Sequence, residues 1–251
     1  MYYRSRALII KNRDYRETDK LVTFFSEQEG KATAVARGVK KPASSLRACV
    51  QPFCHSLLYL NGGKELGTIT QGSIINFYGN CREDLRRTLY IMYMLELLDK
   101  TLMEHIPLPQ LYEIVLAILD YFNETGLNLL AIRYFETALL INLGYKPVLD
   151  RCVICGAHQN LTAFSISEGG TVCSSCCSNL GMTVRLPGEI LALLKLFVNS
   201  NLKTITRVKA SPRIKVELER FLEQYLEYHL ERKFYVKNTI KTLKNSMHLL
   251  D

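Results

Sequence analysis

Residues 151–181, RCVICGAHQNLTAFSISEGGTVCSSCCSNLG, hold five of the eight cysteines in this 251-residue chain. Four of the five form two Cys-x-x-Cys pairs with seventeen residues between them: Cys152, Cys155, Cys173 and Cys176. Each pair makes a tight turn with both sulfurs pointing inward, and the apolar, hairpin-like run around Phe164 returns the second pair to the first. Four thiolates with no open position predict a closed, structural site for one tetrahedral ion, Zn²⁺.

The sequence disfavours two other roles for these cysteines and leaves a third open. Disulfides are disfavoured because the N-terminus, Met1-Tyr2-Tyr3-Arg4, does not read as a secretory signal, and a reducing compartment keeps thiols free. A redox pair is disfavoured because such motifs occur singly near a βαβ pattern. A relic site without metal remains an alternative. Cys177 also remains open as the fourth ligand, although the turn geometry favours Cys176, and we expect His158 to be a solvated loop residue.

Charge is distributed unevenly along the chain, whose formal net charge is +8. Residues 1–80 carry twelve Lys and Arg against six Asp and Glu, whereas residues 81–150 carry six against ten. A basic region next to an acidic one predicts a polyanionic partner for the first, with solubility alone as the alternative. No apolar run approaches the roughly eighteen residues of a membrane span, so we expect a cytoplasmic protein without a membrane partner.

The first 80 residues predict a small β-domain. Five strand candidates have alternating or apolar patterns and are bounded by turn residues: 5–11, 21–25, 31–37, 52–60 and 67–75. Residues 12–19 read as a polar connection and 38–45 as a loop, with no internal helix pattern. Alternation should send only one of Phe24 and Phe25 into the core. Five short strands in about 75 residues predict a barrel of the OB type.

From residue 81 the apolar period changes to three and four residues, as in amphipathic helices. We expect helices over 85–102, 111–123, 128–143, 187–198 and 211–232, with breaks at Pro107 and Pro109, a cap at Gly144 and a basic tail from 234. The predicted fold class is α+β: a five-stranded OB-fold barrel and a helical domain with an inserted four-cysteine zinc module. The predicted domains are the OB fold (1–80), the first helical part (81–150), the zinc module (151–184) and the second helical part (185–251).

Catalytic motifs are missing from the sequence, which predicts a non-enzymatic protein. There is no phosphate-binding glycine loop, no GxSxG and no HExxH. Candidate polyanion-binding residues instead cluster on the third predicted strand and the loop after it: Lys31, Arg37, Lys40, Lys41 and Arg47. Further cations lie in the first strand and its loop: Arg4, Arg6, Lys11, Arg13 and Arg16. The aromatic residues available for base stacking are Tyr2, Tyr3, Tyr15, Phe53 and Tyr59.

Several stretches, in order along residues 1–185, resemble the RecO family of bacterial recombination mediators. In the first domain they are YRETD (15–19), LVTFF (21–25), EGK (29–31), AVARG (34–38), SSLR (44–47) and QPF (51–53). Further on they are RYFE (133–136), LL (139–140), LGY (143–145) and CVICG (152–156). From residue 186 onward the similarity is only a helical pattern.

The resemblance implies an OB domain, a helical domain and, in many members, a zinc module. It implies binding of single- and double-stranded DNA, annealing of complementary strands, and work with RecR and RecF to load RecA on strands coated by single-stranded DNA-binding protein (SSB). By that likeness Arg37, Lys40, Lys41 and Arg47 fall in the DNA-contacting loop region. Arg133 falls in the motif associated with docking the acidic tail of SSB, with an ordinary ion pair to Glu136 or Glu96 as the alternative. A nucleoid-associated location in the cytoplasm is also implied.

Two other function classes were considered. A zinc-ribbon transcription or translation factor would contact nucleic acid through the cysteine module itself, but no Lys or Arg lies between Cys155 and Cys173. A metal-dependent nuclease needs a cluster of carboxylates that the sequence does not show. We therefore expect the DNA-contacting residues to lie on the barrel and the cysteine module to be structural.

Overall fold

The computed structural model describes residues 2–62, 66–178, 183–231, 235, 238–240 and 242. The chain forms two compact units, one made of Met1–Leu127 with Phe234–Asp251 and the other of Asn128–Lys233. Both contain strands and helices, so the predicted α+β class is confirmed.

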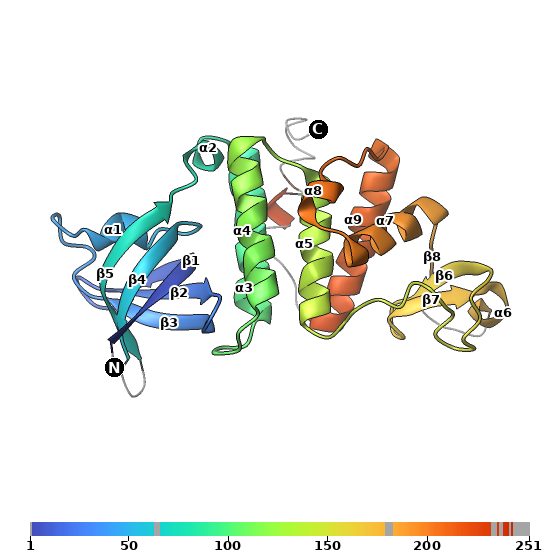
Figure 1. Ribbon diagram of the computed structural model, residues 1–251, viewed down its shortest axis with the longest axis horizontal. Coiled ribbons are helices and arrows are strands. Elements are labelled where there is room, and N and C mark those ends of the chain that lie inside the picture. Colours follow the sequence, from blue (N-terminus) through green and yellow to red (C-terminus); the bar gives the residue numbers. More distant parts are fainter. Residues whose placement is uncertain are drawn as a thin grey trace. The chain divides into compact units, whose positions relative to one another are not determined.

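A closed five-stranded barrel opens the first unit, as predicted (Figure 1). Its strands are β1 (Tyr2–Asp14), β2 (Lys20–Ser26), β3 (Gly30–Ala36), β4 (His55–Asn61) and β5 (Gly67–Asn76). They close in the order β1-β2-β3-β5-β4, with β3 and β5 parallel and every other pair of neighbours antiparallel. Closure leaves no exposed sheet edge and surrounds an apolar core that includes Ile9, Phe24 and Leu58.

Two local expectations for the barrel were wrong. Strand β1 runs on to Asp14, because a bulge between Ile9 and Lys11 lets it stay paired with β2 through residues that read as a polar connection. A one-turn helix, α1 (Leu46–Cys49), lies between β3 and β4 and is too short to give a helical period.

Phe24 and Phe25 are both buried, although alternation sends their side chains to opposite faces. Phe24 lies in the barrel core, as expected for one of the two. Phe25 packs outside it, edge-on to the Tyr112 ring with 5.5 Å between ring centroids. A helix packed on the outside of the barrel therefore covers the second ring.

Three helices complete the described core of the first unit: α2 (Gly79–Arg82), α3 (Leu85–Thr101) and α4 (Pro109–Glu124). Asp84 caps α3 by accepting a hydrogen bond from the Arg87 backbone N–H at 3.1 Å. Pro109 begins α4 rather than ending a helix, because the first turn needs no N–H donor.

The helices of this unit are joined to the barrel by specific contacts. The Tyr112 hydroxyl donates to the Arg6 carbonyl at 2.9 Å and lies 3.0 Å from Nε2 of His55. Gly30, with φ of +68°, meets the backbone of Ile106 so closely that a Cβ would overlap its carbonyl oxygen. The predicted domain boundary at residue 80 thus lies inside a compact unit, since these contacts cross it.

Four helices form most of the second unit: α5 (Leu129–Asn142), α7 (Gly188–Asn199), α8 (Leu202–Ile205) and α9 (Pro212–Leu230). Their predicted caps are present: the Ser211 hydroxyl accepts from the Ile214 N–H at 3.4 Å, and Gly144 adopts φ of +91° beyond the end of α5. The predicted end of the last helix, Arg232, lies outside the described residues, as does most of the basic tail.

A three-stranded sheet of order β7-β6-β8 belongs to the same unit. It consists of β6 (Leu161–Ser165), β7 (Gly170–Cys173) and β8 (Thr183–Arg185), and α6 (Ser174–Cys177) follows β7. Phe164 packs edge-on against Phe221 and Tyr225 of α9, with ring centroids 4.9 and 5.3 Å apart. The sheet is therefore attached to a helix that follows it in sequence, as an insertion requires.

Candidate functional site

The first cysteine pair lies in a turn that is hydrogen-bonded to strand β7. The Val153 N–H donates to the Thr171 carbonyl at 2.9 Å, and the Thr171 N–H donates to the Val148 carbonyl at 2.8 Å. The Gly156 N–H closes the turn onto the Cys152 carbonyl at 2.9 Å, with Gly156 at φ of +77°. These bonds hold Cys152 and Cys155 against the strand that carries Cys173.

The second pair begins where β7 ends. Cys173 is the last residue of the strand, and the single turn of α6 brings the Cys176 sulfur back over it. The Ser174 N–H donates to the Asn160 carbonyl at 3.0 Å, which ties the turn to the start of β6. The β6–β7 hairpin thus brings the second cysteine pair back to the first, as predicted for the apolar run between the pairs.

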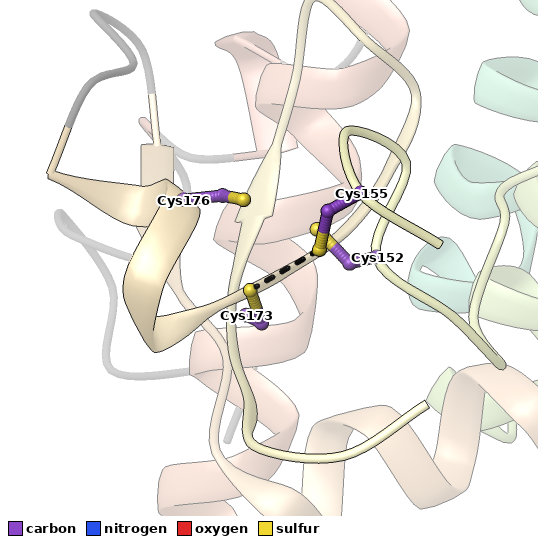
Figure 2. A group of neighbouring side chains, drawn as sticks. All are labelled: Cys152, Cys155, Cys173 and Cys176. Carbon is purple, nitrogen blue, oxygen red and sulfur yellow. Dashed lines mark hydrogen bonds between the residues drawn. The ribbon is translucent and has the colours of Figure 1, made fainter. Parts of the chain in front are cut away.

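The four sulfurs converge on one point (Figure 2), and all lie within 4.8 Å of one another. The Sγ atoms of Cys155 and Cys173 are 3.7 Å apart. A tetrahedral ion with metal–sulfur bonds of about 2.3 Å needs sulfurs about 3.8 Å apart. The residues therefore fit one four-coordinate metal ion, and soft thiolate donors suit a borderline-soft metal.

Local hydrogen bonding gives these thiols different acidities. Burial raises the pKa of Cys152, but backbone hydrogen bonds at Cys155, Cys173 and Ile154 outweigh it and lower that pKa to about 6. Hydrogen bonds to the sulfurs of Cys155 and Cys173, together with burial, raise the pKa of Cys176 to about 12. Hydrogen bonds from the backbone thus favour the thiolate form of Cys152, which is the form that binds a metal ion.

Two nearby residues stay outside the cluster. The sulfur of Cys177 lies 3.6 Å from the Thr183 hydroxyl, and the Nδ1 atom of His158 lies 2.9 Å from the Asp150 carbonyl. Geometry therefore brings Cys176, and not Cys177, together with the other three cysteines. His158 is exposed, as expected of a loop residue.

A second candidate site lies at one end of the barrel, where two loops are tied together. The Lys40 N–H donates to the Thr18 carbonyl at 3.0 Å, and the Gly38 N–H donates to Oδ1 of Asp19 at 2.8 Å. That hydrogen bond is the main reason why the pKa of Asp19 lies below its usual value. The loop after β3 is therefore held in place before any ligand arrives.

Arg47 of α1 shapes this loop from its other side. Its guanidinium donates to the carbonyls of Lys40 and Lys41 at 3.0 and 2.9 Å. The Lys40 ammonium pairs with Asp14 at 2.8 Å, which lowers the pKa of that carboxyl. Arg37, Lys41 and Arg47 are exposed. Four of the five predicted polyanion-binding residues therefore lie in or beside this loop: Arg37, Lys40, Lys41 and Arg47.

Lys31 does not join the other four. Its ammonium donates to the Asp99 carbonyl at 2.8 Å, near the C-terminal end of α3, where carbonyl groups attract cations. Lys11 of β1 pairs with the Asp99 carboxylate. Both lysines therefore help to join the barrel to a helix.

No functional role was predicted for Lys20 from the sequence. It lines a hollow of about 330 Å³ together with Lys40 and Arg47. It faces Ala36 across β2 and β3, one residue before Arg37. The signal was its position at the start of a strand, which places it at the same end of the barrel as the loop after β3.

Of the aromatic residues considered for stacking, Phe53 is buried and excluded. The Arg82 guanidinium lies over its ring, 3.8 Å from the ring centroid, and also over the Phe77 ring at 4.0 Å. The four tyrosines, Tyr2, Tyr3, Tyr15 and Tyr59, are exposed. Tyr15 lies in the loop tied to Lys40, and Arg16 lies over its ring.

Arg133 of α5 is only 3% exposed and forms an ion pair with Glu136 at 3.1 Å. This is the pairing that the sequence left open as an alternative. Glu136 is fully buried, so the pair stabilises two charges that would otherwise be costly to bury.

Among the residues that the structure describes, no helix has both the length and the apolar character needed to cross a membrane.

Two family models match the chain. The model for the N-terminal part of recombination protein O covers residues 1–78, and the model for its C-terminal part covers residues 82–237. The models meet near residue 80, whereas the compact units divide at residue 127.

Curated relatives match over nearly the whole chain. A DNA repair protein RecO from Syntrophomonas wolfei is 55% identical over 247 residues, which is 98% of this chain and 99% of that protein. The RecO protein of Pelotomaculum thermopropionicum is 36% identical over 92% of this chain and 90% of its own length. That of Bacillus pumilus is 34% identical over 98% of both chains.

Proposed function

This chain belongs to the RecO family of DNA repair proteins, and from that premise we propose that it is a non-enzymatic mediator that binds and anneals DNA. Single- and double-stranded DNA are its proposed ligands. Together with RecR and RecF it would help to load RecA on strands coated by SSB. Its proposed location is the cytoplasm, in association with the nucleoid.

The observation that carries this proposal is the preorganised basic loop of the barrel. Arg37, Lys40, Lys41 and Arg47 gather where two loops are fixed by hydrogen bonds, and Lys20 adds a fifth cation. Contacts of this kind follow a phosphate backbone without reading its sequence. An exposed tyrosine, Tyr15, beside the loop supports stacking on a base.

The test is DNA binding and strand annealing, with and without SSB. We expect Lys40→Glu/Lys41→Glu to weaken single-strand binding at least about tenfold and to flatten its salt dependence by roughly 1.4 in log–log slope. Lys203→Glu/Lys209→Glu changes the net charge equally in the other unit and should bind almost as the wild type does. A wild type that neither binds nor anneals at low salt would contradict the proposal.

For the cysteine cluster we infer one structural Zn²⁺ held by Cys152, Cys155, Cys173 and Cys176. Four thiolates satisfy the ion completely, which leaves no position for a substrate or water. The bound ion would supply cross-linking alone, because it joins the first turn to the end of β7. Elemental analysis should find one zinc per chain in protein expressed without metal supplementation.

Arg133 is the proposed contact for the acidic tail of SSB. Since its guanidinium is buried with Glu136, the pair would have to open for a carboxylate to reach it. A cation beside an apolar surface suits a peptide that ends in an apolar residue and a free carboxylate.

A pair of variants separates tail binding from stability. Arg133→Met takes the guanidinium of this ion pair away from the buried Glu136 carboxylate and should lower the free energy of unfolding by about 3–5 kcal/mol. Arg133→Met/Glu136→Leu removes both charges and should recover most of that loss. If Arg133 contacts the tail, the double variant stays folded but does not bind a tail peptide. Wild-type binding by the double variant would reduce Arg133 to a structural role.

A further inference from the structure

The second compact unit carries two basic grooves that are both lined by helix α7. One, of about 430 Å³, lies between α7 and the segment that precedes the first cysteine pair. The other, of about 600 Å³, lies between β8, the start of α7 and α9. Ile190 lines the second groove and Lys195 the first, a separation of roughly 8 Å along the helix axis.

Each groove has three cations on its rim. They are Lys146, Arg151 and Lys195 in the first, and Arg185, Arg213 and Arg220 in the second, all exposed. Arg213 pairs with Glu217 at 2.8 Å, while the other five form no ion pair with any residue in the described part of the chain. Asp150 is the acidic residue of the first groove and Glu217 that of the second, so positive charge dominates both.

Apolar side chains also line both grooves. Val148, Leu149 and Val198 line the first, and Leu186, Ile190 and Phe221 line the second. Cations beside apolar side chains fit a ligand with a charged backbone and flat, weakly polar groups, as single-stranded nucleic acid has. A short acidic peptide would occupy one such groove, whereas a longer polyanion can occupy both.

The cysteine module helps to position these cations. Arg151 directly precedes Cys152, and Arg185 pairs with Ala163 in the sheet that contains Cys173. The module has no basic residue between its cysteine pairs, yet residues at its two edges supply two of the six cations.

We propose that the two grooves form a second binding surface for single-stranded DNA, so that one chain holds two strands at the same time. This inference rests on the proposed DNA-binding function of the barrel. Holding both strands converts their encounter into an intramolecular step at a raised effective concentration. Cations on both surfaces also reduce the repulsion between the two phosphate backbones.

The test counts strands bound per full-length, metal-loaded chain, using a short fluorescent oligothymidine at low salt. The groove variant is Lys146→Ala/Lys195→Ala/Arg185→Ala/Arg220→Ala, with Arg151 left intact because it adjoins Cys152. Its matched control removes four cations of the same unit outside the grooves: Lys203→Ala/Arg207→Ala/Lys209→Ala/Lys215→Ala.

We expect two strands per chain for the wild type and the control, and one for the groove variant. The barrel variant Lys40→Glu/Lys41→Glu should also keep one. In the wild type, the four groove cations should contribute roughly 3 to the log–log salt slope of the second binding step, which the groove variant lacks. Annealing should slow in the groove variant, while circular dichroism and zinc content stay unchanged.

Two strands per chain in the groove variant, or a single strand in the wild type, would overturn this inference and leave the barrel function standing. A wild type that binds no strand would instead reject the proposed function itself. If the groove variant keeps its strands but loses an acidic, phenylalanine-ended probe peptide, the grooves are a peptide site and the strand proposal is wrong.

Discussion

The barrel and the cysteine module are both small β-structures, but they are stabilised in different ways. The barrel closes its five strands around a core of fourteen buried residues that includes Ile9, Phe24, Leu58 and Ile69. The module has three short strands, and the buried residues of its cysteine end are Cys152, Val172 and Cys173. Two of these three are cysteines of the candidate metal centre.

The barrel and the module are stabilised differently because they bury different amounts of apolar surface. Burying apolar surface contributes roughly 25 cal/mol per Å², and a closed barrel buries enough to offset the entropy of ordering its chain. A sheet of three strands of three to five residues does not, so its cysteine end needs a cross-link. The apolar residues on its other side, such as Phe164, contribute by packing on α9.

The largest expected effect is the loss of zinc and of folded structure in the cysteine module. Cys152→Ser removes one of the four ligands and should abolish stoichiometric zinc binding. The module should then unfold locally, since structural zinc sites contribute on the order of 10 kcal/mol to the folding of small modules. Residues around 148–178 should become sensitive to protease, whereas single-strand binding by the barrel changes less than about twofold. Elemental analysis and limited proteolysis measure both.

Cys177→Ser is the matched control, because that sulfur contacts Thr183 and lies outside the cluster. It should keep its zinc. Metal loss from Cys177→Ser together with retention in Cys176→Ser would contradict the ligand assignment.

A smaller effect tests the join between the barrel and the segment that links α3 to α4. Gly30→Ala places a Cβ against the Ile106 carbonyl at a residue with φ of +68°, and should lower the free energy of unfolding by about 3 kcal/mol. Zinc content should not change, because the cysteines belong to the other unit. Denaturant unfolding followed by circular dichroism measures the loss.

Gly79→Ala is the control for that change, since a Cβ at Gly79, the first residue of α2, meets nothing within 4 Å. Equal destabilisation by the two variants would show that the close approach at Gly30 is unimportant.

The smallest effect is a pH dependence confined to the first unit. Burial lowers the pKa of His55 below its ordinary value of 6.5, with Asp120 opposing and Arg6 adding to the shift. The unfolded chain therefore binds this proton more readily, so stability is complete above about pH 6.5 and declines as the pH falls through the folded pKa.

His55→Gln can still bond to the Tyr112 hydroxyl but does not titrate. Its melting temperature should fall less than that of the wild type between pH 7.5 and 5.0. If the melting temperatures of the two proteins fall in parallel with pH, His55 is not the source of the pH dependence.

The residues that were predicted well share one property, which is that their signal is local. Cys-x-x-Cys turns, the cap at Ser211 and the glycine after α5 each depend on a few neighbouring residues. The five strands were found because a barrel strand alternates along its own length. Which strands pair with which was not predicted, and the structure supplies that order.

The failures share the opposite property. Phe53 was a candidate for base stacking and Lys31 for polyanion binding, but the Arg82 guanidinium lies over the Phe53 ring and the Asp99 carbonyl accepts from the Lys31 ammonium. These partners lie 29 and 68 positions away. Lys20 was given no role, and only the pairing of β2 with β3 places it at the end of the barrel that holds Arg37 and Lys40. No window of sequence contains such pairs.

By itself, then, the sequence determined the α+β class, the barrel, the two Cys-x-x-Cys pairs and the family, because periodicity, spacing and motif are properties of neighbouring residues. Only the tertiary structure decided which cations share the barrel loop, which cysteine completes the cluster, and that six cations spread over 75 positions meet in two grooves along α7. Those outcomes depend on contacts between segments far apart in the chain. Packing, and not local preference, brings such segments together.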